Sequence, residues 1–167
     1  MTTFYLLVGL PGTGKSTWTS KFKRNNRDQL INKSIFDNIG FKDNLTIIST
    51  DNLIQSIADE YRLTYNQVFG DITYSFAEKM TYKLAKYAFG REDIVIWDQT
   101  NLTKKSRKKK LDIVPSSYYK VCVTFGIPDD LNERLSNRPG KVIPENVMMN
   151  MIKSYEPPTL DEGFNDI

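Results

Sequence analysis

Near its N-terminus this chain of 167 residues reads Gly9-Leu10-Pro11-Gly12-Thr13-Gly14-Lys15-Ser16-Thr17. The stretch fits the pattern G-x-x-x-x-G-K-[ST], in which glycines allow a tight turn and backbone N–H groups surround phosphate oxygens. An apolar run at residues 4–8 precedes it and predicts a buried strand, and a helix-compatible segment follows from Ser16 to Asn26. A chance glycine-rich turn is the alternative, which the flanking strand and helix disfavour. We therefore predict a P-loop that binds a nucleoside triphosphate.

Each residue type in this loop suits the chemistry of a bound phosphate chain. Lys15 can reach the β- and γ-phosphates, and the hydroxyl of Ser16 can ligate Mg²⁺. The start of the following helix adds partial positive charge at the same point. The full set of predicted nucleotide contacts is Gly9, Pro11, Gly12, Thr13, Gly14, Lys15, Ser16 and Thr17.

The composition excludes several kinds of protein. There is no histidine, which rules out a histidine-based triad or zinc site, so a general base must be a carboxylate or another group. The single cysteine, Cys122, excludes an internal disulfide framework and suits a reducing cytosol, so we expect a cytoplasmic protein. The N-terminal apolar run is too short to cross a membrane. A net charge of +3 is too small to indicate nucleic-acid binding by itself.

Two further apolar runs end in acidic residues. Residues 45–48 predict a strand that leads into Ser49-Thr50-Asp51-Asn52, and residues 94–97 predict a strand that leads into Asp98-Gln99-Thr100-Asn101. Ligands of α/β sheets bind at the carboxyl ends of the strands. Asp51 is therefore either a catalytic carboxylate or the N-cap of the next helix. Asp98 either holds Mg²⁺, directly or through water, or belongs to a turn.

The middle of the chain carries the longest helical pattern, from Asn66 to Phe89. We expect Gly70 to divide it, and apolar residues at every fourth position predict its buried face: Ile72, Phe76, Met80 and Leu84. The polar segment 27–44 has no clear period and is expected to be a surface excursion.

Two features of the sequence are open to more than one interpretation. Residues 104–110 include six basic residues of seven, which indicates either a solvated face or an attraction for polyanions. The tyrosines at 65, 74 and 82 are expected in the core, with base stacking as the alternative.

The last third of the chain predicts a strand at 119–125 and a short helix at 130–137. Arg134 and Arg138 lie four residues apart on one face, and their forked, permanently charged groups suit a transferring phosphoryl group. A surface salt-bridge helix is the alternative. Pro139-Gly140 ends that helix and leaves Lys141 in a loop, and another helix is expected from Pro144. This segment, at about 128–143, suits the lid of a phosphotransferase.

Short strands that alternate with helices predict one domain, residues 1–167, of the α/β class. We expect a P-loop kinase fold with a four- to five-stranded, mainly parallel sheet flanked by helices and an arginine-bearing helical lid.

In these motifs the chain resembles the kinase domain of the 5′-polynucleotide kinases of phage, bacteria and animals. The matching segments are residues 9–17, Ser49-Thr50-Asp51, Asp98-Gln99-Thr100-Asn101, Arg134 with Arg138, and residues 157–164, in the order of the family. The resemblance implies that ATP, with Mg²⁺, donates its γ-phosphate to the 5′-hydroxyl end of a DNA or RNA strand.

The resemblance also implies a role for individual residues. Asp51 matches the general base, and Arg138 matches the arginine that neutralises charge on the transferred group, with help from Arg134. Lys15 and Ser16 serve the phosphates and Mg²⁺. Asp98 or Gln99 matches an acidic position that helps to bind the acceptor, and the predicted substrate-binding segment continues through Thr100 and Asn101.

The chain departs from the family at three points. Ile54 stands where phage-type members have an arginine that grips the acceptor's 3′-phosphate, so a preference for such acceptors depends on Arg62 or the basic run. The Asp-x-Asp-x-Thr motif of the phosphatase domain is absent, and the chain ends at Ile167, so we expect a standalone kinase or an excised domain. The alternatives are a kinase of a small molecule (nucleoside, sugar or antibiotic), a toxin-like kinase, or a nucleotide-binding module without catalysis. The sequence leaves the oligomeric state open.

Overall fold

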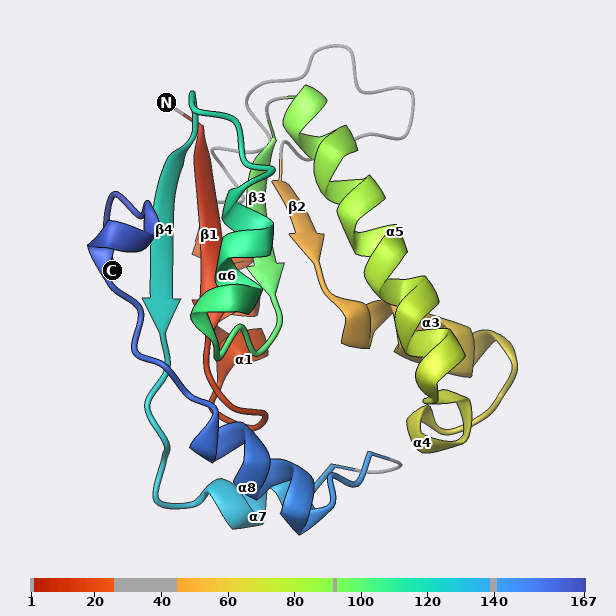
Figure 1. Cartoon of the computed structure of the whole chain (residues 1–167). Helices are drawn as coiled ribbons and strands as arrows, with labels where there is room; N and C mark the ends of the chain where they lie inside the picture. Colours follow the sequence, from red (N-terminus) through yellow and green to blue (C-terminus); the bar gives the residue numbers. More distant parts are fainter. Residues whose placement is uncertain (1, 26–44, 92, 139–140) are drawn as a thin grey trace.

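The computed structural model describes residues 2–25, 45–91, 93–138 and 141–167 (Figure 1). Its sheet has four strands, β1 (Thr3–Val8), β2 (Leu45–Ile48), β3 (Ile94–Asp98) and β4 (Tyr119–Thr124). The strand order is β2-β3-β1-β4, and every neighbouring pair is parallel. The predicted α/β fold with a four- to five-stranded parallel sheet is confirmed.

Helices cover both faces of the sheet, because successive side chains of a buried strand point to opposite faces and both sets are apolar here. Helix α1 (Lys15–Asn25) packs Trp18 and Phe22 against the face that carries Leu7. Helices α5 (Asp71–Gly90) and α6 (Lys104–Leu111) pack Ala85 and Leu111 against the opposite face. Figure 1 shows α5 and α6 in front of the sheet and α1 behind it.

The remaining helices lie near the carboxyl ends of the strands. Helices α3 (Thr50–Glu60) and α4 (Tyr65–Val68) follow β2, and α7 (Leu131–Ser136) and α8 (Glu145–Lys153) follow β4. In Figure 1 the arrowheads of the sheet point toward the level at which these four helices are found. A 3-10 turn, η1 (Leu160–Glu162), closes the chain near β4, where Asp166 forms a parallel bridge with Val121.

The buried face of α5 differs from the prediction. Ile72 and Phe76 have exposed fractions of 88% and 56%, whereas the buried positions include Ala77, Thr81, Ala85, Ala88 and Phe89. The alanines allow this helix to lie close to the sheet, and Leu84 of the predicted face does pack against the core, as do Tyr82 and Phe89. Gly70 does divide the segment, as the N-cap of α5.

Three other expectations can be compared with the structure. Cys122 is buried in the core, as predicted. The expected surface excursion at 27–44 lies outside the described residues. Within the described ranges, no helix has the length and apolar character needed to span a bilayer.

Candidate active site

The carboxyl ends of β1, β2 and β3 bring the P-loop, Asp51 and Asp98 to the wall of one cavity of about 910 Å³. Most of the predicted site residues line it: Pro11, Gly12, Gly14, Lys15, Ser16, Thr17, Asp51, Asp98, Gln99, Thr100, Asn101, Arg134 and Arg138. The other two, Gly9 and Thr13, shape the loop instead. The N–H of Gly9 donates to the carbonyl of Thr100 at 3.0 Å, and the Thr13 hydroxyl donates to the carbonyl of Leu10 at 2.8 Å.

The P-loop has the backbone conformation that its glycines permit. Gly12 and Gly14 have φ angles of 83° and 101°, in the left-handed region that favours glycine. A Cβ on Gly12 would also lie 2.9 Å from Leu131 of α7, so this position holds the loop against the base of the predicted lid. Helix α1 begins at Lys15, which turns its free N–H groups toward the cavity.

Lys15 is a buried cation of the loop. Its ammonium donates to the carbonyls of Gly9 and Leu10, at 2.8 and 2.7 Å. Burial lowers the pKa of Lys15 to about 8, and the charges of Asp98 and Asp51 oppose this shift. Close to neutral pH the side chain therefore remains a cation that can bind phosphate.

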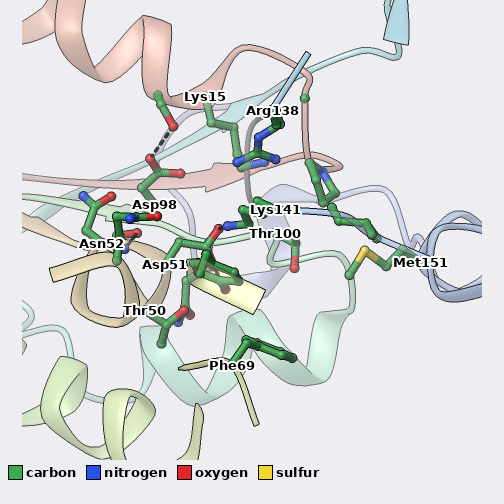
Figure 2. A pocket seen from close by; sticks show the side chains of 18 of the residues that line it. Lys15, Thr50, Asp51, Asn52, Phe69, Asp98, Thr100, Arg138, Lys141 and Met151 are labelled. Carbon is green, nitrogen blue, oxygen red and sulfur yellow. Dashed lines mark hydrogen bonds and ion pairs between the residues drawn. The ribbon is translucent and has the colours of Figure 1, made fainter. Parts of the chain in front are cut away.

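Ser16 and Asp98 place a hydroxyl and a carboxylate close together, within electrostatic reach of Lys15. The Ser16 hydroxyl donates to Oδ2 of Asp98 at 3.5 Å (Figure 2). Burial raises the pKa of Asp98, while the charge of Lys15 opposes the rise. A hydroxyl and one carboxylate fit Mg²⁺, a hard cation that keeps several waters and completes its shell with substrate phosphates.

Asp51 is not the N-cap of α3. That role belongs to Ser49, whose hydroxyl accepts from the N–H of Asn52 at 3.2 Å. The Asp51 carboxylate accepts from the Tyr65 hydroxyl at 2.8 Å through Oδ1, and from the Lys141 ammonium in a short contact through Oδ2. Partial burial raises the pKa of Asp51, but the charge of Lys141 and these two hydrogen bonds outweigh it and hold the pKa below its ordinary value. The carboxylate is therefore ionised at neutral pH and able to accept a proton.

The arginines of the predicted lid differ in their surroundings. Arg138 is half-buried, and its charge lowers the pKa of both Lys15 and Asp51, which puts the guanidinium within electrostatic reach of both. Figure 2 shows Arg138 at the same end of the cavity as Lys15. Arg134 lines the cavity but also pairs with Asp130 at 2.7 Å, the local salt bridge that the sequence left open.

The end of β3 separates Asp98 and Gln99, the two candidates for the acceptor-binding position. Asp98 faces Ser16 of the P-loop, whereas Gln99 donates to the Thr50 hydroxyl at 3.1 Å and so faces α3. Asn101 is buried with a φ of 51°, and its amide donates to the carbonyl of Leu7 at 2.7 Å. Direct substrate binding by Gln99, Thr100 and Asn101 stays a prediction.

The sequence did not predict that Lys141 or Tyr65 would contact the carboxylate of Asp51. Both contact Asp51, and the Lys141 ammonium also lies 3.9 Å from the centre of the Tyr65 ring. The Tyr65 ring stacks on Phe69 with centroids 5.5 Å apart, and Tyr74 meets the edge of Phe69 at 6.1 Å. These three rings line the cavity beside Asp51. The one feature of the sequence that could have indicated this role is the position of Lys141 in a loop, directly after Pro139-Gly140.

Arg107, from the basic run, is fully buried and holds the C-terminal segment to α6 and to the segment that follows β3. Its Nε and Nη2 donate to the two carboxylate oxygens of Glu162, each at 2.7 Å. Nη1 donates to the backbone carbonyls of Asn101, Leu102 and Glu156. The tail motif at 157–164 is thereby tied to the segment that follows β3.

Comparison with known proteins supports this description of the chain. The family described as AAA domain (AAA_33) matches residues 5–158. Heterogeneous nuclear ribonucleoprotein U-like protein 2 of Mus musculus is 26% identical over 165 residues, which cover 97% of this chain and 20% of that protein. The Homo sapiens protein of that name gives the same figures. The chain thus spans about a fifth of the length of these relatives.

Solved structures with the same fold include kinases and a repair complex. A chain of the Pnkp1/Rnl/Hen1 RNA repair complex superposes with a TM-score of 0.66 and 19% identity, over 92% of this chain and 44% of that chain. A gluconokinase from Sinorhizobium meliloti 1021 gives a TM-score of 0.54 and 14% identity, over 99% of this chain and 81% of that chain. At these identities the likeness concerns the fold. The family match over residues 5–158, together with a P-loop after β1 and a parallel sheet of order β2-β3-β1-β4, shows that the chain belongs to the AAA_33 family of AAA domains and has the fold of P-loop kinases.

Proposed function

We propose that this protein is an ATP-dependent kinase that transfers the γ-phosphate of ATP to the 5′-hydroxyl end of a DNA or RNA strand. The observation that carries the proposal is the position of Asp51, an ionised carboxylate that shares one cavity with the P-loop lysine and an arginine of the lid segment. A nucleotide-binding module without catalysis has no need for that carboxylate.

In the proposed reaction the acceptor oxygen forms a bond to the γ-phosphorus, the bond from that phosphorus to the bridging oxygen of ADP breaks, and the hydroxyl proton passes to Asp51. In this proposal Lys15 and Arg138 neutralise charge on the transferring group, and Arg134 assists them. Ser16 and Asp98 would hold Mg²⁺, which supplies further charge neutralisation when it is bound.

The acceptor side of the cavity supports a nucleotide end as the substrate. Tyr65, Phe69 and Tyr74 form an aromatic wall next to Asp51, and Phe69 is half-exposed. Base–aromatic stacking contributes about 1–3 kcal/mol per base and suits any sequence. The base-stacking alternative for Tyr65 and Tyr74 thus gains support, although Tyr65 also has the task of positioning Asp51.

The names of similar proteins are consistent with a nucleic-acid acceptor. One structure with this fold belongs to an RNA repair complex, and the relatives from mouse and human are named ribonucleoproteins. We extend that association to this chain as part of the proposal.

A small-molecule kinase is the second candidate. The fold is shared over 99% of this chain with a gluconokinase and over 100% with a sugar kinase from Janibacter sp. HTCC2649. Ile54 also favours a small-molecule acceptor, because this fully buried apolar residue offers no cation to an acceptor phosphate.

The test is transfer of labelled γ-phosphate from ATP with Mg²⁺ to a panel of acceptors. The panel contains 5′-hydroxyl DNA and RNA oligonucleotides, nucleoside 3′-monophosphates, nucleosides, gluconate and a 5′-phosphorylated control strand. The proposal predicts label on the 5′-hydroxyl strands and none on the control. Label on gluconate or nucleosides alone would establish the second candidate instead.

A further inference from the structure

The basic run at 104–110 is divided by the packing of α6. Lys104, Lys105, Lys108 and Lys109 are exposed, whereas Arg107 and Lys110 are buried. Arg107 is occupied by Glu162 and three carbonyls, so it has a structural task. Lys110 differs, because it lines the active-site cavity.

Lys110 places a positive charge on the cavity wall away from the P-loop. Its ammonium donates to Oδ1 of Asn101, and a lysine has three N–H donors, so further donors are available to a ligand. Burial lowers the pKa of Lys110 to about 8, and the charge of Glu78 opposes this shift. The side chain is therefore a cation at neutral pH.

A shallow groove between α5 and α6 lies next to the active-site cavity. A second, smaller cavity is lined by Glu78, Lys79 and Tyr82 of α5 and by Lys109 of α6. Glu78 lines both cavities, so the two are adjacent. The fully buried Trp97 of β3 packs against one lining residue of each cavity, since its ring centre lies 5.1 Å from that of Tyr82 and 5.7 Å from the ammonium of Lys110.

The charge of this groove favours a polyanion. Three lysines, at 79, 109 and 110, face one glutamate, Glu78. A chain of phosphates is the ligand that needs several cations in a row, whereas a sugar or a nucleoside offers no charge to Lys79 and Lys109. Arg62, which the sequence suggested as a substitute for the missing arginine, lines neither cavity.

We propose that the groove between α5 and α6 binds the sugar–phosphate backbone of a single-stranded acceptor, on the 3′ side of the nucleotide whose 5′-hydroxyl lies at Asp51. The inference rests on the proposed function and extends it, because it makes the acceptor a polymer rather than a mononucleotide. Lys110 contacts the phosphate nearest the reaction site, and Lys79 and Lys109 contact phosphates further along the strand.

The test compares binding and transfer in the double variant Lys79→Ala/Lys109→Ala. Both side chains are exposed, so the fold is retained. The matched control is Lys21→Ala/Lys23→Ala, which removes the same charge from exposed positions of α1, on the opposite face of the sheet. Binding of a fluorescent 5′-hydroxyl 12-mer, as DNA and as RNA, is followed by anisotropy from low to moderate salt.

The inference predicts that the groove variant binds the strand more weakly than wild type, whereas its use of a mononucleotide acceptor is nearly unchanged. Each lost phosphate contact reduces the magnitude of the slope of log K against log salt by about 0.7. The slope of the groove variant should therefore be smaller in magnitude by about 1.4 than that of wild type, and the slope of the control should be nearly unchanged. The KM for the 12-mer should rise about tenfold, with the KM for a nucleoside 3′-monophosphate within about twofold of wild type. Lys110→Met should weaken both acceptors, with a thermal melt to verify folding.

Two other outcomes would each reject one of the two proposals, either the groove or the kinase activity. Equal salt slopes in the groove variant and the α1 control, with the strand still phosphorylated, would reject the groove and leave the proposed function intact. Lysine-dependent binding of the 12-mer without phosphate transfer to any strand would support the groove and reject the kinase assignment.

Discussion

Replacement of Asp51 by asparagine tests the proposed chemistry most directly, because the change keeps the shape of the side chain and removes its basicity. The carbonyl oxygen of the new amide can still accept the hydrogen bond that Tyr65 donates at 2.8 Å to Oδ1 of Asp51. General-base catalysis contributes about 10²- to 10⁴-fold in rate. At about 1.36 kcal/mol for each tenfold change, the activation barrier should rise by about 3–5 kcal/mol.

The structure limits the side effects of this substitution. The Asp51 side chain is 56% exposed, so its pair with Lys141 contributes about 0.2–1 kcal/mol to stability. At about 2–4 °C per kcal/mol, Tm should fall by no more than about 4 °C. Asp98 exerts a larger charge effect on Lys15 than Asp51 does, so the ATP affinity should stay within about threefold of wild type.

The measurements are single-turnover transfer of labelled phosphate to a 5′-hydroxyl strand, calorimetric titration of ATP and a thermal melt. Asp59→Asn provides the control, because it removes the same charge from an exposed position on the same helix. Transfer by Asp51→Asn within threefold of wild type would refute the assignment of the base. A parallel loss of ATP affinity would assign Asp51 to nucleotide binding instead.

Three further predictions concern charge. Glu162→Gln should lower the free energy of unfolding by about 3–5 kcal/mol, hence Tm by roughly 6–20 °C, because it leaves the buried Arg107 unpaired. Burial raises the pKa of Glu162, but the hydrogen bonds from Arg107 outweigh burial and hold the pKa below its ordinary value. The stabilisation by the Arg107–Glu162 pair is therefore complete above about pH 4.3, the pKa of an unfolded glutamate, and it is lost as the pH falls through the lower pKa of the folded state. ATP affinity should weaken about tenfold at pH 9 relative to pH 7, since Lys15 loses its proton above about pH 8. Lys141→Met should move the acid limb of kcat/KM to higher pH, because Lys141 holds the pKa of Asp51 down.

Each of these predictions has a control within the chain. Asp112→Asn breaks the exposed pair with Lys108 and should cost less than about 1 kcal/mol. An equal loss of unfolding free energy in Glu162→Gln and Asp112→Asn would show that the Arg107–Glu162 pair stabilises the fold no more than an exposed pair does. Lys15→Met should show no pH dependence of ATP affinity between pH 7 and 9. Lys153→Met, an exposed change on α8, should leave the acid limb in place, and an unmoved limb in Lys141→Met would contradict the proposed effect on Asp51.

The features that the sequence predicted correctly are local. The P-loop follows from the spacing of Gly9, Gly12, Gly14 and Lys15, because those residue types are needed at those backbone positions. Four short apolar runs predicted the four strands. The parallel order of strands and helices then brought Asp51 and Asp98 to one edge of the sheet, since parallel strands place their carboxyl ends together.

What only the tertiary structure decided depends on contacts between distant residues and on which way a helix faces. Lys141 reaches Asp51 across 90 positions, and Arg107 reaches Glu162 across 55, so neither pairing leaves a local pattern. In a run of basic residues no apolar positions mark the face of the helix that packs inward. Only the packing of α6 against β3 shows that Lys110 lines the cavity. The sequence by itself determined the phosphate-binding loop and the edge of the sheet where chemistry can occur. The tertiary structure decided which side chains contact Asp51 and which side chains line the groove proposed for the acceptor, because both depend on the packing of α3 to α8 around that edge.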